Sequence, residues 1–343
     1  MGRPAHPSVL WGLASYQCRA PLRPKPPVTM AITQIRASTT ATMNSQWIVN
    51  PTPKATIAKS AKMTSSSIVV LSFPPSGIAF RVREGNGEAA NRVTHVKSRA
   101  VDLTGKRAIV TGASSGIGRA TARALAALGV RVAGGARRAA RLETEIAHEL
   151  DVTDPESSAR FVEAAIDGLG GLDILVNNAG GALGRAPFDE SSDEDEAWVI
   201  GTNVAGLMRM TRLCLPHFAD WGHIVNIGSV AGRAAYEGGA SYITAKFAER
   251  GFTYALREDL LGRPIRVTTV DPGLVEGTEF SLVRFKGDEE KAAAVYRGVE
   301  PLQPSDVVDC ILFALTRPWH VNVDEIVVKA RTQSSGARIL RDE

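Results

Sequence analysis

Several features that define other classes of protein are scarce or absent in this sequence. Its three cysteines are widely separated and odd in number, which excludes a disulfide framework and metal-ligand spacing. The six histidines include no His-x3-His pair, so we expect no catalytic metal. The longest apolar run of the N-terminal region, SIVVLSF, is far shorter than the roughly 20 residues that a membrane-spanning helix requires. We therefore expect no membrane span.

Acidic residues are absent from the first 83 positions, which nevertheless carry ten lysines and arginines. The rest of the chain holds 30 basic and 36 acidic residues, a net charge of −6, so the pI near 9.0 comes from the N-terminal leader alone. The rest of the chain also lacks a basic stripe interleaved with aromatic residues. We therefore expect no nucleic-acid partner.

The leader, residues 1–100, is rich in serine, threonine, alanine and proline and has no sustained hydrophobic periodicity, so we expect it to be disordered. A basic, hydroxyl-rich and acid-free composition is typical of organellar transit peptides, which would place the protein in a plastid or mitochondrion. The alternative is a start codon assigned too far upstream, with Met30, Met43 and Met63 as later candidates, and a cytoplasmic protein.

From Val101 to the C-terminus, short β-branched apolar runs alternate with helical segments rich in alanine, leucine and arginine. The runs are nearly continuous in hydrophobicity, as in parallel strands that are buried on both faces. We expect strands over residues 107–112, 130–135, 172–180, 222–229, 265–273 and 324–330. The alternation predicts an α/β fold over residues 101–343, a single doubly wound parallel sheet (Rossmann-like) with helices on both faces. Ligands of such sheets bind at the carboxyl ends of the strands.

One connection is too short for this pattern. Only 12 residues separate Arg138 from Asp151, and a crossover helix of about 11 residues, a strand of about 5 and two turns do not fit there. Either the helix is truncated or a segment is missing from the sequence. In both cases we expect a weakened adenine side of any cofactor pocket.

The segment IVTGASSGIGRAT combines a strand, a glycine-rich turn and a helix start. Gly112, Gly116 and Gly118 allow a tight turn and close approach of the backbone, and the N–H groups of the helix N-terminus favour an anion such as a pyrophosphate. Such a turn alone is a weak signal, because it also occurs for purely structural reasons. Its place after a strand and at the start of the domain favours phosphate binding.

At the end of the second strand, an enzyme that uses NAD would carry an acidic residue for the ribose 2'-hydroxyl. This chain has Arg137 and Arg138 there, and a guanidinium matches the geometry of a 2'-phosphate. The alternative is two solvated arginines, although cations are poorly placed beside a helix N-terminus without an anion. We expect NADP(H) as the cofactor.

The segment ASYITAKFAERG carries a tyrosine and a lysine four residues apart, so Tyr242 and Lys246 lie on one face of a helix. The ordinary pKa of a phenol, near 10, is too high for a general base at neutral pH, and a neighbouring ammonium lowers it. Ser229 ends the strand GHIVNIGS, at the carboxyl edge of the sheet, where its hydroxyl can donate to the same substrate oxygen. The three residues predict proton transfer to or from that oxygen.

These residues, together with TGASSGIG, NNAG, Asn203 in IGTNVAG, and DPG, resemble the short-chain dehydrogenase/reductase family from Leu103 to the C-terminus. The resemblance implies that Tyr242 is the acid/base and that Lys246 lowers its pKa and holds the nicotinamide ribose. It also implies that Ser229 polarises the substrate oxygen and that Asn203 anchors a water of the proton relay. The remaining implied cofactor contacts are Ser114, Ser115, Ile117, Asp151, Val152, Asn178, Ala179, Gly180, Pro272, Gly273, Leu274, Val275 and Thr278.

The segments DPGLVEGTEFSLVRFKGDEEKA and VNVDEIVVKARTQSS narrow the resemblance to the bacterial NADP-dependent 3-hydroxy acid dehydrogenases, also described as serine or allo-threonine dehydrogenases. This implies hydride transfer between NADP(H) and the carbinol or carbonyl carbon of a small 3-hydroxy acid. We hypothesise that Arg284 or Lys286 binds the substrate carboxylate; a solvated loop is the alternative.

Two other functions remain open at this point: a carbonyl or 3-oxoacyl reductase of the same superfamily, and a sensor or scaffold that binds NADP(H) without turnover. The complete set of Ser229, Tyr242 and Lys246 argues against the second of these. The family resemblance also implies a homodimer or homotetramer formed by the two helices that carry Asn203 and Tyr242.

Overall fold

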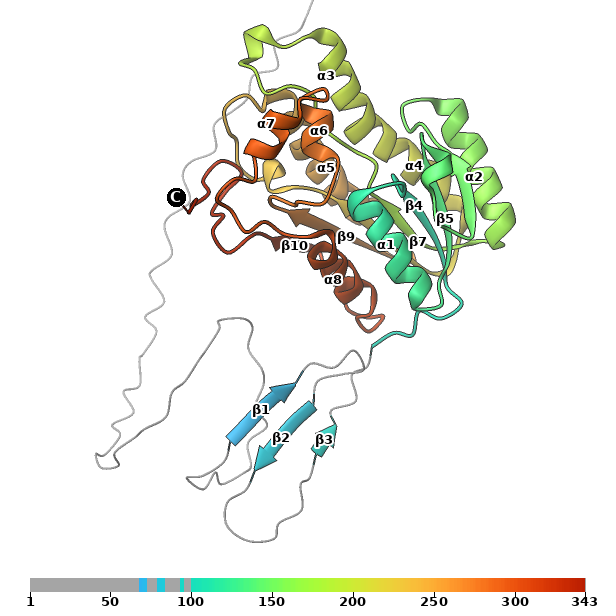
Figure 1. Ribbon diagram of the computed structural model, residues 1–343. Helices are drawn as coiled ribbons and strands as arrows, with labels where there is room; N and C mark the ends of the chain where they lie inside the picture. Colours follow the sequence, from blue (N-terminus) through green and yellow to red (C-terminus); the bar gives the residue numbers. More distant parts are fainter. Residues whose placement is uncertain (1–67, 73–78, 84–92, 96–99, 343) are drawn as a thin grey trace, which may run out of the picture. The chain divides into compact units, whose positions relative to one another are not determined.

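The computed structural model describes residues 68–72, 79–83, 93–95 and 100–342, and Figure 1 shows its elements. Strands β1 (Ile68–Ser72), β2 (Ala79–Arg83) and β3 (Val93–His95) form a small antiparallel sheet in the order β1-β2-β3. The sequence analysis expects no regular structure before residue 101, and these strands depart from that expectation. Phe80 to Arg83, FRVR, alternate apolar and polar residues, which is the pattern of a strand. The rest of the leader lies outside the described residues, and its boundary at residue 100 stays a prediction.

The main domain contains the expected parallel sheet. Its seven strands lie in the order β10-β9-β8-β7-β4-β5-β6, and all neighbours are parallel. The strands are β4 (Arg107–Thr111), β5 (Arg131–Ala136), β6 (Ile146–Glu149), β7 (Leu172–Asn177), β8 (Phe218–Ile227), β9 (Ile265–Pro272) and β10 (Glu325–Val328). The order reverses between β4 and β7, so a crevice for a ligand is expected at their carboxyl ends.

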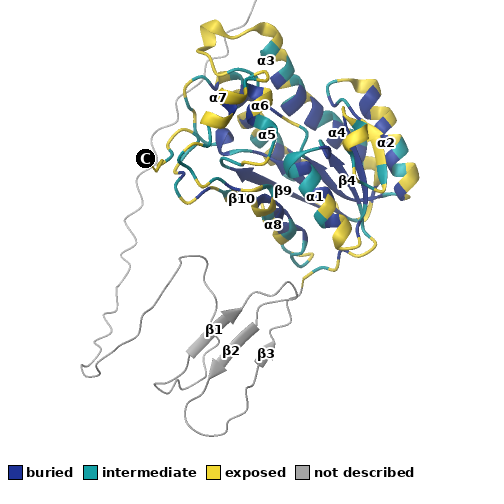
Figure 2. Cartoon of the chain, viewed as in Figure 1, coloured by how far each residue is buried: buried dark blue, intermediate teal, exposed yellow. Residues whose placement is uncertain are grey.

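Helices cover both faces of this sheet (Figures 1 and 2). The elements are α1 (Gly116–Ala127), α2 (Pro155–Leu169), α3 (Asp193–Ile200), the π-helical turn η3 (Gly201–Gly206), α4 (Leu207–Cys214), α5 (Ala240–Asp259), α6 (Phe280–Arg284), α7 (Glu289–Ala294) and α8 (Pro304–Leu315). Leu125 of α1 and Ile311 of α8 belong to one apolar core, and Phe161 of α2, Met210 of α4 and Leu256 of α5 belong to the other. The doubly wound architecture is confirmed.

The short connection between β5 and β6 contains one turn of 3-10 helix, η1 (Ala139–Arg141), in place of a crossover helix. Strand β6 is retained and pairs in parallel with β5. The connection thus has no crossover helix, and this agrees with both explanations, a truncated helix and a segment missing from the sequence. Helix α2 packs against Ile146 of β6, but no crossover helix covers the other face of the strand, and three of its four residues are exposed. Two exposed ion pairs, Arg123 with Glu143 and Arg131 with Glu145, bind the connection to the rest of the domain.

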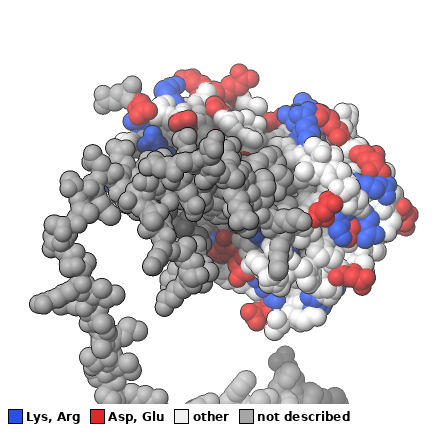
Figure 3. All heavy atoms as spheres, turned by 90° about the horizontal axis from the view of Figure 1, so that it is seen from below, with Lys and Arg blue, Asp and Glu red and all other residues white. Residues whose placement is uncertain are grey.

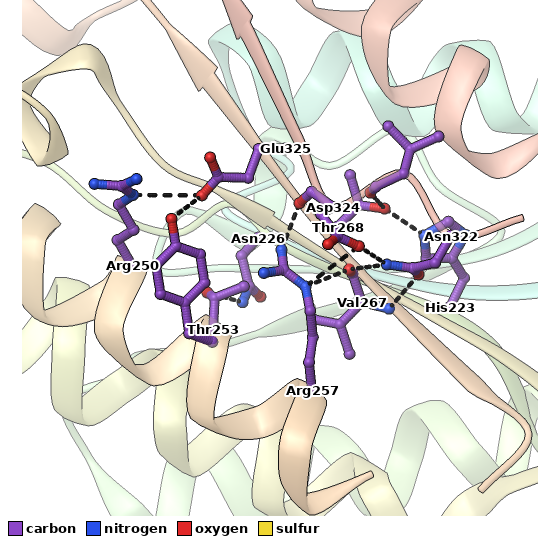
Figure 4. A network of polar contacts seen from close by, with 12 residues as sticks. His223, Asn226, Arg250, Thr253, Arg257, Val267, Thr268, Asn322, Asp324 and Glu325 are labelled. Atoms are coloured by element: carbon purple, nitrogen blue, oxygen red, sulfur yellow. Dashed lines mark hydrogen bonds and ion pairs between the residues drawn. The ribbon is translucent and has the colours of Figure 1, made fainter. Parts of the chain in front are cut away.

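Helix α5 is held against the sheet by polar contacts to β9 and β10, which Figure 4 shows from close by. The Arg257 Nε donates to the Val267 carbonyl at 3.0 Å, and the Tyr254 hydroxyl donates to Glu325 Oε1 at 2.5 Å. These contacts fix the helix on which the predicted catalytic pair lies.

The surface of the main domain carries mixed charge. On the face that Figure 3 shows, where the described residues are visible, basic and acidic side chains are interspersed. This agrees with the nearly balanced composition after residue 83. Within the described part of the chain, no helix combines the length and the apolar character needed to cross a membrane.

Candidate active site

Tyr242, Lys246 and Ser229 lie together at the carboxyl ends of the strands. Tyr242 and Lys246 are buried on one face of α5, and the Lys246 Nζ lies 5.8 Å from the centre of the Tyr242 ring. Ser229 follows β8 and caps the short turn η5 (Val230–Gly232), where its Oγ accepts a hydrogen bond from the Ala231 N–H at 3.1 Å. Its hydroxyl lies close enough to the Tyr242 phenol to lower the pKa of that phenol, and both side chains line the same cavity. The structure therefore assembles the predicted proton-transfer group.

The pKa of the Tyr242 phenol is raised above its ordinary value of 10, because burial outweighs the Lys246 ammonium and the nearby Ser229 hydroxyl, which both lower it. The sequence analysis expects a lowered pKa from the lysine alone. The ammonium does act in that direction, but the expectation took no account of desolvation, which periodicity does not reveal. Tyr242 is thus a protonated phenol at neutral pH in this state, ready to act as an acid.

The Lys246 ammonium is bound by two internal acceptors. Its Nζ donates to the Ile227 carbonyl at 2.9 Å and to Glu249 Oε2 at 2.7 Å. Burial lowers the pKa of Lys246, but the Glu249 carboxylate raises it, and the pKa is raised overall. Glu249 was not among the predicted site residues, although its position three residues after Lys246 on the same helix was a signal.

Asn203 lies beside this group but does not line the cavity. It is buried in η3, where its Nδ2 donates to the carbonyls of Gly181 and Val199, both at 2.8 Å, and its Oδ1 accepts from the Gly181 N–H at 3.2 Å. Both ends of the amide thus hold the loop after β7. The anchoring of a water by Asn203 stays a prediction.

A cavity of about 370 Å³ opens at the switch point of the sheet. Among the described residues, no group of three histidine, cysteine or acidic side chains is placed to hold a metal ion. Nearly all of the predicted site residues line the cavity. They are Gly112, Ser114, Ser115, Gly116, Ile117, Arg137, Arg138, Asp151, Val152, Asn178, Ala179, Gly180, Ser229, Tyr242, Lys246, Pro272, Gly273, Leu274, Val275 and Thr278.

The N-terminus of α1 fits an anion. Gly112 and Gly116 adopt φ values of 68° and 53°, which favour glycine and turn the chain sharply. The first turn of α1 contains no acidic residue, and Ser115 makes no side-chain capping bond, whereas Asp154 caps α2. The N–H groups of this turn therefore remain for a ligand.

Gly118, unlike the other predicted glycines, does not line the cavity. A Cβ at Gly118 would lie 2.4 Å from the carbonyl oxygen of Gly112 and 2.3 Å from Nδ2 of Asn178. A cofactor contact of Gly118 stays a prediction, and the structure gives this glycine a packing role. Gly118 lets the helix approach the preceding turn, since no side chain fits between them.

The two predicted phosphate-binding arginines differ in their surroundings. Arg137 lies with its guanidinium 5.7 Å from the centre of the Trp198 ring. Arg138 pairs with Glu279, from the loop after β9, and Arg141 Nη1 donates to the same carboxylate at 3.0 Å. Arg138 is the largest of the influences that lower the pKa of Glu279 to about 2. This contact joins the β5–β6 connection to the loop after β9, and both segments line the cavity.

Arg284, but not Lys286, lies in the cavity beside Tyr242. Arg284 is 9% exposed, its guanidinium carbon lies 6.0 Å from the centre of the Tyr242 ring, and its Nη1 donates to the Tyr236 hydroxyl at 3.1 Å. Within the described part of the chain, no carboxylate forms an ion pair with it. The Lys286 side chain is 61% exposed and pairs with Asp195 at 2.7 Å. Of the two hypothesised cations, only Arg284 faces the catalytic phenol.

The C-terminal segment also borders the cavity, through residues that include Gln333, Ile339 and Arg341. Gln333 is buried, and its Oε1 accepts a hydrogen bond from the Leu274 N–H at 2.8 Å. None of these three residues was among the predicted site residues. No local pattern marks them, because the segment reaches the cavity only through the folded chain.

Comparison with known proteins agrees with this geometry. The family model described as short chain dehydrogenase matches residues 106–288. The NADP-dependent 3-hydroxy acid dehydrogenase of Schizosaccharomyces pombe is 42% identical over 70% of this chain and 98% of that relative. The serine 3-dehydrogenase of Agrobacterium fabrum is 38% identical over 68% of this chain and 98% of its own length. The closed form of a serine dehydrogenase complexed with NADP+ is similar with a TM-score of 0.65 and 38% identity, covering 69% of this chain and all of that one.

Proposed function

The chain belongs to the short chain dehydrogenase family, and from that premise we propose that it is an NADP(H)-dependent oxidoreductase acting on a small, serine-like 3-hydroxy acid. A hydride passes between the nicotinamide and the carbinol or carbonyl carbon of the substrate. The observation that carries the substrate class is the buried Arg284 guanidinium beside Tyr242, which no described carboxylate neutralises. The names of the similar dehydrogenases support the same class.

The side chains of the site supply proton transfer and orientation. Tyr242 exchanges a proton with the substrate oxygen, and the Ser229 hydroxyl donates to the same oxygen. The positive charge of Lys246 stabilises the phenolate that forms when Tyr242 gives up its proton. When bound, the nicotinamide supplies or accepts the hydride.

The choice of NADP(H) is supported by the charge at the adenine end of the cavity. Arg137 and Arg138 line it, and both are exposed where a 2'-phosphate would lie. The N-terminus of α1 provides N–H groups for the pyrophosphate. Arg284 then lies at the other end, where a substrate carboxylate would neutralise it.

The test uses the full-length protein with NADP+ and four acids: L-serine, L-allo-threonine, 3-hydroxyisobutyrate and 3-hydroxypropionate. We expect formation of NADPH with at least one of them and loss of turnover in Tyr242→Phe. If NADPH binds but no acid is oxidised, the substrate class is wrong, and a carbonyl or 3-oxoacyl reductase becomes the next hypothesis. Binding without turnover of either class would indicate a sensor or scaffold.

We further propose that the protein is a homodimer or homotetramer that packs through α5, which carries Tyr242, and through the continuous helix of α3, η3 and α4, which carries Asn203. Phe247 and Tyr254 of α5 are 45% and 41% exposed, which is apolar area that a second copy would bury. Light scattering after size-exclusion chromatography measures the mass directly. A monomer at micromolar concentration would contradict the proposal.

For localisation, we propose that residues 1–100 direct the chain to a plastid or mitochondrion. The support is their acid-free, hydroxyl-rich composition. A fluorescent protein fused after residue 100 should accumulate in one of these organelles. Cytoplasmic fluorescence would instead favour a later start at Met30, Met43 or Met63.

A further inference from the structure

Glu249 is a buried carboxylate that the reaction described above does not use. It lies on α5 one turn beyond Lys246, and 1% of its surface is exposed. Its Oε2 accepts a hydrogen bond from the Lys246 ammonium at 2.7 Å, whereas its Oε1 has no hydrogen-bond partner among the described residues. Burying a carboxylate is costly unless a charged partner offsets the loss of hydration, and Lys246 is the charged side chain that Glu249 contacts. The contact with Lys246 is therefore what accounts for this residue.

Glu249 acts on the cavity only through Lys246. Lys246 lines the cavity and Glu249 does not. An ammonium has three donors, and the Ile227 carbonyl and Glu249 take two of those of Lys246. The third is left to face the cavity, so the two internal acceptors determine the direction in which the lysine points. Glu249 touches neither substrate nor cofactor, and its effect on the reaction is indirect.

The other charged groups near this pair do not replace Glu249. Asp271 of β9 is the other carboxylate whose charge acts on Lys246, but its Oδ2 already accepts from the Arg233 Nε at 2.6 Å. The charged and titratable groups that face the phenol of Tyr242 are Lys246, Glu249, Tyr236 and Arg284. Glu249 is thus the carboxylate in direct contact with the catalytic ammonium.

We propose that Glu249 is the positioning residue of the catalytic lysine: its buried carboxylate fixes the Lys246 ammonium behind Tyr242 and keeps it charged at alkaline pH. The inference rests on the proposed function, since it assigns a role within that site. Burial alone would lower the pKa of Lys246, and the Glu249 carboxylate reverses this effect. Burial also raises the pKa of Glu249 to about 7, so its negative charge is present above neutral pH, where an unpaired buried lysine would lose its proton.

The first test needs neither cofactor nor turnover. Full-length wild type, Glu249→Gln and the matched control Glu258→Gln, which changes an exposed glutamate of the same helix, are treated over a range of pH with an acylating reagent that attacks neutral amines. Mass spectrometry quantifies acylation of Lys246, with the exposed Lys291 as internal reference. We expect the pH of half-labelling of Lys246 to fall by about 1–3 units in Glu249→Gln and to stay unchanged in Glu258→Gln.

An unchanged midpoint in Glu249→Gln would overturn the proposal. So would a wild-type Lys246 whose midpoint lies below the ordinary lysine value of about 10.4, a result that needs no variant and keeps the proposal testable if Glu249→Gln does not fold.

The second test is the pH profile of kcat/KM for oxidation of a 3-hydroxy acid. We expect Glu249→Gln to lose activity at a lower alkaline pH than wild type, mainly through kcat, and Glu249→Asp, which keeps the charge, to recover most of the alkaline range. If the wild type is active and Glu249→Gln loses kcat/KM at the same alkaline pH as the wild type, the proposed role of Glu249 is contradicted. If the wild type oxidises no acid at all, the proposed function fails instead, and the labelling experiment still decides the role of Glu249.

Discussion

At the scale of single residues, Arg284 is the side chain on which substrate choice depends. Replacing it with glutamine removes the positive charge beside Tyr242 but keeps a hydrogen-bonding group. A hydrogen bond to a charged group contributes about 1.5–3 kcal/mol, so kcat/KM for 3-hydroxy acids should fall about 10- to 100-fold, through KM. Steady-state kinetics with acids, and with alcohols of the same length that lack the carboxylate, measures the difference.

Lys286→Gln is the matched control for Arg284→Gln, because Lys286 is close in sequence but exposed and paired with Asp195. Its kinetics should equal those of wild type. An unchanged KM for acids in Arg284→Gln, in a protein that still binds NADPH, would remove the argument for a carboxylate-bearing substrate.

The same scale shows which parts of the site a sequence can reveal. Helical periodicity places Tyr242 and Lys246 together, because residues four apart always share a face. Periodicity does not show how completely a side chain is removed from water, and the burial of Tyr242 reverses the expected shift of the phenol pKa. The pairing of Arg138 with Glu279 joins residues that are far apart along the chain, and only the fold brings them into contact.

At the scale of elements, the close approach of α1 to the turn before it depends on Gly118. A Cβ there would meet the Gly112 carbonyl at 2.4 Å, so Gly118→Ala should lower the free energy of unfolding by about 1–3 kcal/mol and weaken NADPH binding. Gly251→Ala is the opposite case, because its Cβ on α5 would meet nothing within 4 Å, and it should stabilise by about 1 kcal/mol. Urea unfolding of both variants tests the contrast. If the two substitutions change the free energy of unfolding equally, the close packing of α1 against the preceding turn does not depend on Gly118.

The connection between β5 and β6 is joined to the loop after β9 by Glu279, which holds Arg138 and Arg141. A carboxylate in this position competes with a 2'-phosphate for the same guanidinium groups. Since exposed ion pairs contribute about 0.2–1 kcal/mol, Glu279→Gln should tighten NADPH binding by up to about five-fold and leave NADH binding unchanged.

The control for Glu279→Gln is Glu276→Gln, which removes an exposed carboxylate from the same loop. Fluorescence titration of both variants with NADPH and NADH gives the four affinities. Weaker NADPH binding in Glu279→Gln would mean that Glu279 mainly holds Arg138 and Arg141 in position for the 2'-phosphate and does not compete with it.

Most elements of the main domain follow from the sequence, because strands buried on both faces leave continuous apolar runs and the alternation with helices restricts the topology. The exceptions have physical reasons. The number of residues between β5 and Asp151 shows that a crossover helix does not fit. It does not show that β6 still forms, with one face uncovered, because that depends on its pairing with β5. The C-terminal segment lines the cavity through Gln333, and such a tertiary contact has no local pattern.

At the scale of the whole molecule, two buried groups give the stability of the fold opposing dependences on pH. Burial, with a smaller effect of Arg266, lowers the pKa of His223 well below 6.5, so the unfolded chain binds a proton below pH 6.5 that the folded chain excludes. The stability that His223 provides is therefore present above pH 6.5 and is lost as the pH falls. Glu249 acts in the opposite sense, because its raised pKa of about 7 lets the folded chain bind a proton between about pH 7 and the unfolded value of 4.5.

Removing one of the two groups should therefore leave the pH dependence of stability that the other group causes. From pH 7 to pH 5, His223→Gln should gain stability relative to its own value at pH 7, and Glu249→Gln should lose it, by at most about 1.4 kcal/mol per pH unit for one proton. Glu279 and Glu325, whose pKa values are lowered to about 2, release their contributions only below this window. Urea unfolding at fixed ionic strength measures the two slopes. Slopes of the same sign would mean that burial does not shift the pKa of at least one of these two groups in the expected direction.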